Sequence, residues 1–146
     1  MKKASSDLLL LDVNVLLAIA WPDHQFHATA VRALSSQNRW ATCALTQLGF
    51  IRLSSNPAVI ATAKSPHEAT GVLERLGADS LHIYLDSLPA PVSENWRDAF
   101  AELLGHQQVM DAYLLRRAAA SNAVLVTFDR RLESLAAGRP RVRVLG

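Results

Sequence analysis

The sequence predicts an α/β fold in which a central parallel sheet is covered by helices on both faces. Short apolar runs alternate along the chain with segments whose apolar residues recur at helical spacing. The runs Leu8–Asp12 and Ala123–Phe128 are almost continuously apolar, which is typical of strands buried on both faces of a sheet. Parallel neighbours need long crossover connections, and the helices between the runs supply them. Because the 146 residues contain no internal repeat or flexible linker, we expect one domain over residues 1–146.

The first half of the chain contains the clearest helix signal. Ser65-Pro66-His67-Glu68 is a capping box with proline at the first helical position, and Gly77 ends the helix that it begins. Before this helix, the pattern predicts a strand at Leu8–Asp12, a helix over Asn14–Ala20, a helix capped by Asp23, a strand at Trp40–Cys43, and a helix capped by Thr42 that ends before Pro57.

The second half continues the alternation. The pattern predicts a strand over Leu81–Leu85, a helix capped by Ser93 and ended by Gly105, a helix over Val109–Ser121, a strand over Ala123–Phe128, a short helix over Leu132–Ala136, and a last strand over Val142–Leu145. This order extends the parallel sheet to the end of the chain.

The composition excludes several classes of protein. Half of the residues are hydrophobic and 19% are charged, which excludes disorder over most of the chain. The single cysteine, Cys43, excludes an intrachain disulfide and a cysteine zinc cluster, and it fits a reducing compartment. Residues 111–146 hold seven arginines and three acids, whereas residues 1–110 hold eight Lys/Arg and ten Asp/Glu. The basic end either faces an anion or forms a solvated surface.

The amino-terminal segment is similar in composition to a secretory signal, because Lys2 and Lys3 precede an apolar stretch. Asp7, Asp12 and Asn14 interrupt that stretch, and charged or amide groups are costly in an apolar membrane segment. No stretch approaches the ~18 apolar residues that a membrane span requires. We therefore expect a soluble, unprocessed, cytoplasmic protein with no membrane contact.

Three aspartates occupy positions that favour a shared site. Asp12 and Asp129 each end a predicted strand, and Asp111 opens a predicted helix. The carboxyl ends of parallel strands share one edge of the sheet, where ligands bind. Carboxylates brought together repel, and a hard cation such as Mg²⁺ or Mn²⁺ relieves the repulsion. Taken singly, each residue also fits a turn, a cap or a favourable helix-dipole position.

Three sequence blocks resemble those of a known family. Leu9-Leu10-Leu11-Asp12-Val13-Asn14-Val15-Leu16-Leu17, Asp111-Ala112-Tyr113-Leu114 and Leu125-Val126-Thr127-Phe128-Asp129-Arg130 resemble, in order and spacing, the signature blocks of PIN-domain nucleases, in particular VapC-type toxins. The resemblance covers nearly the whole chain. It implies a three-layer α/β/α domain, hydrolysis of RNA with Mg²⁺ or Mn²⁺, a homodimer, and silencing by a cognate VapB-type antitoxin.

The resemblance also implies roles for individual residues. Asp12, Asp111 and Asp129 become catalytic metal ligands, directly or through water. Asn14 and Thr127 become groups that orient these ligands. Arg130 either contacts a substrate phosphate or is a surface arginine.

One position departs from the family pattern. The family places a glutamate early in the helix after the second strand, where this chain has Gln47. A glutamine carbonyl can bind a hard cation but brings no charge, so affinity for the metal should fall. Gln47 is therefore a weak ligand, a substrate contact or a polar helix residue.

Two alternatives to a nuclease follow from the same residues. Gln47 is compatible with a weakened site that binds RNA or a protein without cleavage. A phosphotransferase using Asp12 as nucleophile fits less well, because Asn14 stands where the haloacid-dehalogenase motif has a second aspartate. The chain has no Gly-x-Gly-x-x-Gly after its first strand and no Gly-Lys-Ser/Thr loop, which disfavours dinucleotide and nucleoside triphosphate folds.

Overall fold

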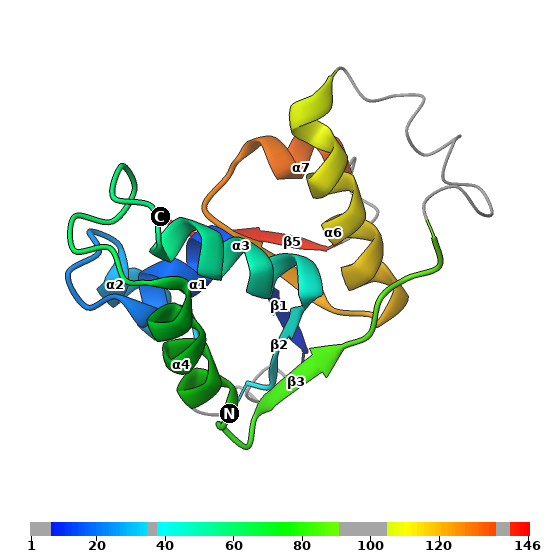
Figure 1. Ribbon diagram of the computed structural model, residues 1–146. Coiled ribbons are helices and arrows are strands. Elements are labelled where there is room, and N and C mark those ends of the chain that lie inside the picture. The colour runs from blue at the N-terminus through cyan, green and yellow to red at the C-terminus, as the bar shows by residue number, and fades with distance from the viewer. Residues whose placement is uncertain (1–6, 35–37, 91–104, 137–140) are drawn as a thin grey trace.

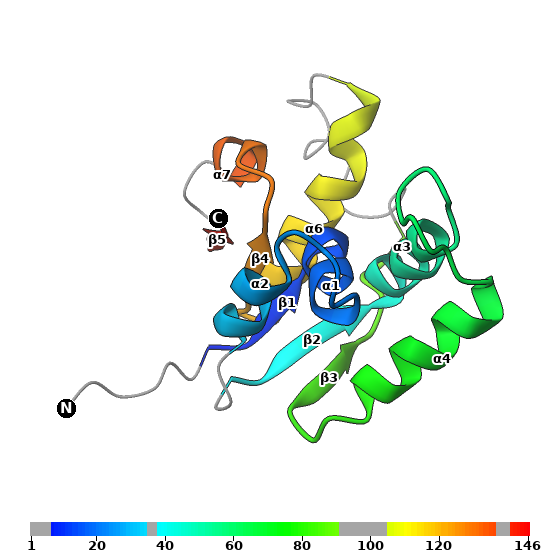
Figure 2. The same cartoon turned by 90° about the vertical axis from the view of Figure 1, so that its left-hand side faces the viewer.

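The computed structural model describes residues 7–34, 38–90, 105–136 and 141–146, and in them it contains a five-stranded parallel sheet. The strands lie in the order β3-β2-β1-β4-β5, and β3 and β5 form the opposite edges (Figure 1, Figure 2). Their bounds are β1 Leu9–Leu11, β2 Trp40–Cys43, β3 His82–Leu85, β4 Val124–Thr127 and β5 Val142–Val144. All four pairings are parallel, which confirms the predicted sheet.

Helices cover both faces of the sheet, as Figure 1 shows. One face packs against α1 Val13–Ala20, α2 His27–Ala33, α3 Ala44–Ser54 and α4 Pro66–Gly77, and the other packs against α6 Val109–Ala120 and α7 Arg131–Ala136. A short 3₁₀ helix, η1 His106–Gln108, precedes α6. The three-layer α/β/α arrangement is therefore confirmed.

The central strands show why the sequence reads as continuously apolar. Leu9 and Leu11 contribute to the core beneath α1, whereas Leu10, between them, contributes to the core beneath α6. All three side chains are at most 1% exposed. Successive strand residues point to opposite faces, so a strand covered on both sides must be apolar at every position.

Most predicted elements are confirmed to within two residues, but two helices begin differently. Asp23 does not cap α2, which starts at His27 after a pair of turns. His24 Nδ1 accepts the backbone N–H of Phe26 at 3.0 Å, and this bond lies within the turns that precede the helix. Thr42 does not cap α3 because it is fully buried within β2, and Cys43 takes the N-cap position. The predicted helix from Ser93 to Gly105 lies outside the described residues.

Across the described ranges, no helix is both long enough and apolar enough to cross a membrane.

Candidate active site

The candidate site lies where the order of strands reverses. The chain adds β2 and β3 on one side of β1 and then returns to place β4 on its other side. Asp12 directly follows β1, and Asp129 lies two residues after β4. Parallel sheets bind ligands outside the carboxyl ends of the strands at such a switch point, because the crossover connections diverge there.

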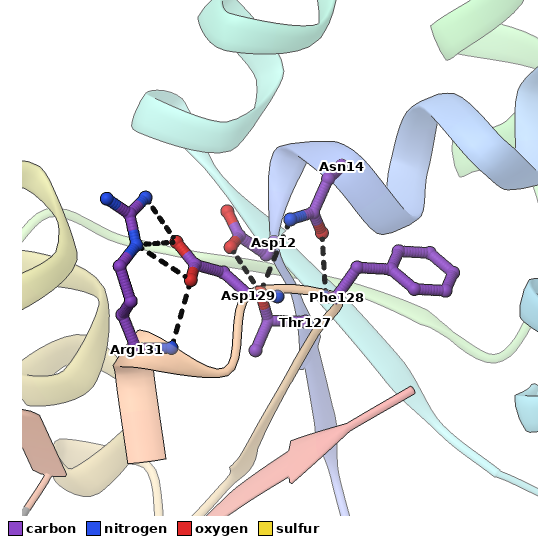
Figure 3. Close-up of polar contacts among 6 residues, drawn as sticks. All are labelled: Asp12, Asn14, Thr127, Phe128, Asp129 and Arg131. Atoms are coloured by element: carbon purple, nitrogen blue, oxygen red, sulfur yellow. Dashed lines mark hydrogen bonds and ion pairs between the residues drawn. The ribbon is translucent and has the colours of Figure 1, made fainter. Parts of the chain in front are cut away.

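The Thr127 hydroxyl joins the ends of β1 and β4 (Figure 3). It donates to Asp12 Oδ2 at 2.7 Å and accepts the backbone N–H of Asp129 at 3.0 Å. Asp12 Oδ1 accepts the N–H of Val13 at 2.7 Å, so both carboxylate oxygens have a donor. Thr127 is fully buried, and these bonds fix one orientation of the Asp12 carboxylate.

Asn14, in the first turn of α1, makes a second connection between the same two strand ends. Its Oδ1 accepts the backbone N–H of Phe128 at 3.2 Å, and its Nδ2 donates to Thr127 Oγ1 over 3.4 Å. Figure 3 shows the Phe128 ring pointing away from the carboxylates, where it stacks on Phe26 with a centroid distance of 4.9 Å. Asn14 and Thr127 thus occupy the orienting positions that the sequence predicted, although their role in catalysis is not tested by these contacts.

Asp111, in the first turn of α6, lies close enough to the strand ends to be influenced by their charges. Burial raises the pKa of Asp111, and the negative charges of Asp12 and Asp129 raise it further. Burial also raises the pKa of Asp12, against the hydrogen bonds from Thr127 and Val13, which lower it. The three predicted acids therefore form one electrostatically coupled group.

Asp129 differs from the other two acids because it has a cationic partner, Arg131. The guanidinium donates to both carboxylate oxygens at 2.8–3.2 Å, and this ion pair holds the pKa of Asp129 below its ordinary value. The sequence prediction had named Arg130, whose side chain is exposed and makes no hydrogen bond or ion pair with any described residue. The phosphate contact of Arg130 stays a prediction, and Arg131 was missed.

Gln47 lies in the first half of α3 and belongs to a polar chain that starts at β3. His82 Nδ1 bonds to the carbonyl of Gly77 at 3.2 Å, and His82 Nε2 lies 2.7 Å from Thr42 Oγ1. Burial lowers the pKa of His82, so the neutral ring keeps its proton on Nδ1 and accepts the Thr42 hydroxyl at Nε2. Thr42 Oγ1 then accepts Gln47 Nε2 at 3.0 Å. The amide orientation of Gln47 is thereby set, and no other described group bonds to its Oε1.

The donor chemistry fits a hard divalent cation. Three carboxylates offer oxygen ligands. Burial, and to a lesser extent mutual repulsion, raises the pKa values of Asp12 and Asp111, and a cation would relieve the repulsion. In the described part of the chain, no three His, Cys, Asp or Glu side chains stand close enough together to surround one ion. Mg²⁺ typically takes one or two carboxylates, keeps several waters and binds substrate phosphates, so an open arrangement suits it.

Comparisons with known proteins agree with this fold. A model of the PIN domain family matches residues 9–138. Ribonuclease VapC38 of Mycobacterium tuberculosis is 39% identical over 140 residues, which cover 94% of this chain and 96% of that protein. The chain therefore belongs to the PIN domain family. Its curated relatives place it among the VapC-type members, which confirms the resemblance in the sequence.

Solved structures share the fold at low sequence identity. The Mycobacterium tuberculosis toxin VapC20, described as cleaving the sarcin–ricin loop, superposes with a TM-score of 0.66 and 13% identity, covering 89% of this chain and 95% of that one. VapBC-1 from nontypeable Haemophilus influenzae superposes with a TM-score of 0.59 and 15% identity, covering 94% and 97%. At these identities the likeness supports the α/β/α fold alone.

Proposed function

We propose that this protein is the toxin of a type II toxin–antitoxin pair, an endoribonuclease that depends on Mg²⁺ or Mn²⁺. The observation that carries the proposal is that Thr127 joins Asp12 and Asp129 at the switch point of the sheet, with Asp111 of α6 near enough to be influenced by both charges. The ribonuclease names of its relatives support the activity, and the VapBC assembly of a structural neighbour supports a VapB-type antitoxin as partner. We also propose a homodimer that acts in the cytoplasm.

One or two of the three acids would hold the cation directly and the others through its waters, and the cation when bound would activate a water and stabilise the charge that develops on the phosphate. The surrounding side chains keep the acids in place. Thr127 donates to Asp12 and accepts the N–H of Asp129, so a shift of either strand end would break one of its bonds. Asn14 is a positioning residue of the same kind, acting through the backbone of Phe128.

We also propose that the neutral side chain of Gln47 contributes to this site. Its Nε2 is already used by Thr42, which leaves Oε1 as the atom available to a cation or to RNA. A carbonyl oxygen can bind a hard cation without adding charge, so a site with Gln47 should bind metal more weakly than one with glutamate.

The test is cleavage of a panel of structured RNAs by the purified protein, free of antitoxin, in Mg²⁺, Mn²⁺ or EDTA. Asp111→Asn removes a ligand charge with nearly the same shape, and it should abolish cleavage while the protein stays folded. Glu74→Gln makes the same chemical change on the exposed face of α4 and serves as the matched control. We expect discrete cuts that require metal, persist in Glu74→Gln and vanish in Asp111→Asn.

Two results would count against the proposal. Cleavage by Asp111→Asn at the wild-type rate would refute the site. Intact RNA under every metal condition, from a protein with a cooperative unfolding transition, would favour a domain that binds RNA or a protein without cutting.

A further inference from the structure

Arg131 is a cation placed directly against a proposed metal ligand. Its guanidinium forms a two-pronged ion pair with Asp129, with a shortest distance of 2.8 Å (Figure 3), and its charge partly offsets the rise that burial causes in the pKa of Asp111. The side chain of Arg131 is 76% exposed, whereas that of Asp129 is 23% exposed. An exposed cation therefore pairs with a less exposed acid that we propose as a metal ligand.

The local fold does not depend on this guanidinium. Asp129 Oδ1 also accepts the backbone N–H of Arg131 at 3.0 Å, and Asp129 N bonds to Thr127, so the turn after β4 is closed without the arginine side chain. An ion pair as exposed as this one adds little to stability, because water screens it and two side chains must be ordered. Removing the Arg131 side chain should therefore leave the turn and the fold in place.

We propose that Arg131 neutralises Asp129 when no divalent ion is bound, competes with that ion for the carboxylate, and once released binds a phosphate of the RNA. This inference rests on the proposed function. A planar guanidinium whose fork already matches two carboxylate oxygens also matches two phosphate oxygens. The competition follows because N–H groups of Arg131 already occupy both oxygens of Asp129, and because the two cations repel each other.

The inference predicts effects of opposite sign on two ligands. Arg131→Ala should bind Mn²⁺ about two- to fivefold more tightly than wild type, the range expected for loss of an exposed ion pair, as measured by electron paramagnetic resonance of free Mn²⁺. The same variant should bind a labelled single-stranded RNA more weakly in Mn²⁺, as measured by fluorescence anisotropy on RNA that a gel shows to be uncut. In EDTA, where Asp129 holds the guanidinium, its loss should change RNA affinity less.

Three further variants interpret these measurements. Arg32→Ala removes an exposed arginine of α2 and should leave Mn²⁺ affinity unchanged. Arg131→Lys keeps the charge but not the fork, so it should retain part of the competition and lose most of the RNA effect. Arg130→Ala tests the neighbouring arginine, and a loss of RNA affinity confined to Arg130→Ala would overturn the assignment to Arg131.

Failure of this inference is distinguishable from failure of the proposed site. If wild type binds Mn²⁺, Asp12→Asn does not, and Arg131→Ala matches wild type, the site stands and the competition is refuted. If Arg131→Ala weakens both Mn²⁺ and RNA binding, the arginine only supports the fold of the loop, and the inference is likewise refuted. If no variant binds Mn²⁺, the metal site and the inference fail together.

Discussion

Gly49 lets α3 approach the start of α1 beside the candidate site. A Cβ atom built on Gly49 would lie 2.7 Å from Val13 Cγ2 and 3.4 Å from Val13 Cγ1. Val13 is β-branched and stiff at χ1, so its side chain has little freedom to turn away. It stands between Asp12 and Asn14, and its N–H donates to the Asp12 carboxylate. Gly49→Ala should therefore strain the residues that hold Asp12.

The expected loss of stability combines two opposing terms. Replacing a mid-helix glycine by alanine favours folding by about 0.5–1 kcal/mol, because the unfolded chain loses freedom. Overpacking a filled contact costs about 1–3 kcal/mol. The sum for Gly49→Ala is close to neutral at the mild end and about 2.5 kcal/mol destabilising at the other.

Gly71→Ala isolates the overpacking term. Gly71 also lies within a helix, α4, but a Cβ there would meet only Arg75 Nη1 at 3.8 Å, an ordinary contact. Gly71→Ala should therefore stabilise the protein by about 0.5–1 kcal/mol, so the two variants should differ by about 1–3 kcal/mol. Urea denaturation followed by circular dichroism measures both free energies of unfolding.

A double-mutant cycle identifies the contact responsible. Val13→Ala removes both clashing methyl groups, so Val13→Ala/Gly49→Ala should be more stable than the sum of the single changes predicts, by about 1 kcal/mol or more. The reasoning is refuted if Gly49→Ala is as stable as Gly71→Ala, or if the changes at residues 13 and 49 are additive.

Three more predictions concern the polar groups of the site. Thr127→Val removes a hydroxyl that makes three hydrogen bonds and should cost about 1–3 kcal/mol of unfolding free energy in urea, whereas Thr127→Ser, which keeps the hydroxyl, should lose less. A Thr127→Val protein as stable as wild type would refute this role of the hydroxyl. Because the pKa of Asp111 is raised, the folded state binds the proton of Asp111 more tightly than the unfolded state does. This proton binding stabilises the fold fully below the ordinary pKa of 3.8, and the stabilisation is lost as the pH rises through the raised pKa. In EDTA, Asp111→Asn should therefore be more stable than wild type at neutral pH, and this difference should vanish below pH 3.8. Urea denaturation of both proteins across pH measures the difference in unfolding free energy, and a difference that did not change with pH would contradict the prediction. Gln47→Glu should raise the pKa of His82, as followed by NMR. The Thr42 hydroxyl would donate to the new carboxylate and could then only accept a hydrogen bond from His82, which requires a protonated ring. An unchanged titration of His82 would mean that the three side chains are not connected in this way.

The sequence was sufficient for the sheet because the sheet depends on local patterns. Apolar runs that end in an acid, such as Leu8–Asp12, predict both a doubly covered strand and the position of its carboxylate. The start of α2 could not be predicted in the same way. It depends on the bond between His24 and Phe26, which competes with a cap at Asp23 and is favoured by the packing of Phe26 on Phe128, about a hundred residues away.

Within the site, the sequence predicted which types of residue take part, but it did not predict which of them form hydrogen bonds with one another. The conformation of the turn between β4 and α7 decides whether the side chain of Arg130 or that of Arg131 faces the Asp129 carboxylate. The amide direction of Gln47 is likewise decided by His82, which reaches Thr42 only after β3 has paired with β2. The protonation state of His82 therefore determines which atom of the Gln47 amide faces Thr42, and no local sequence pattern around Gln47 contains that information.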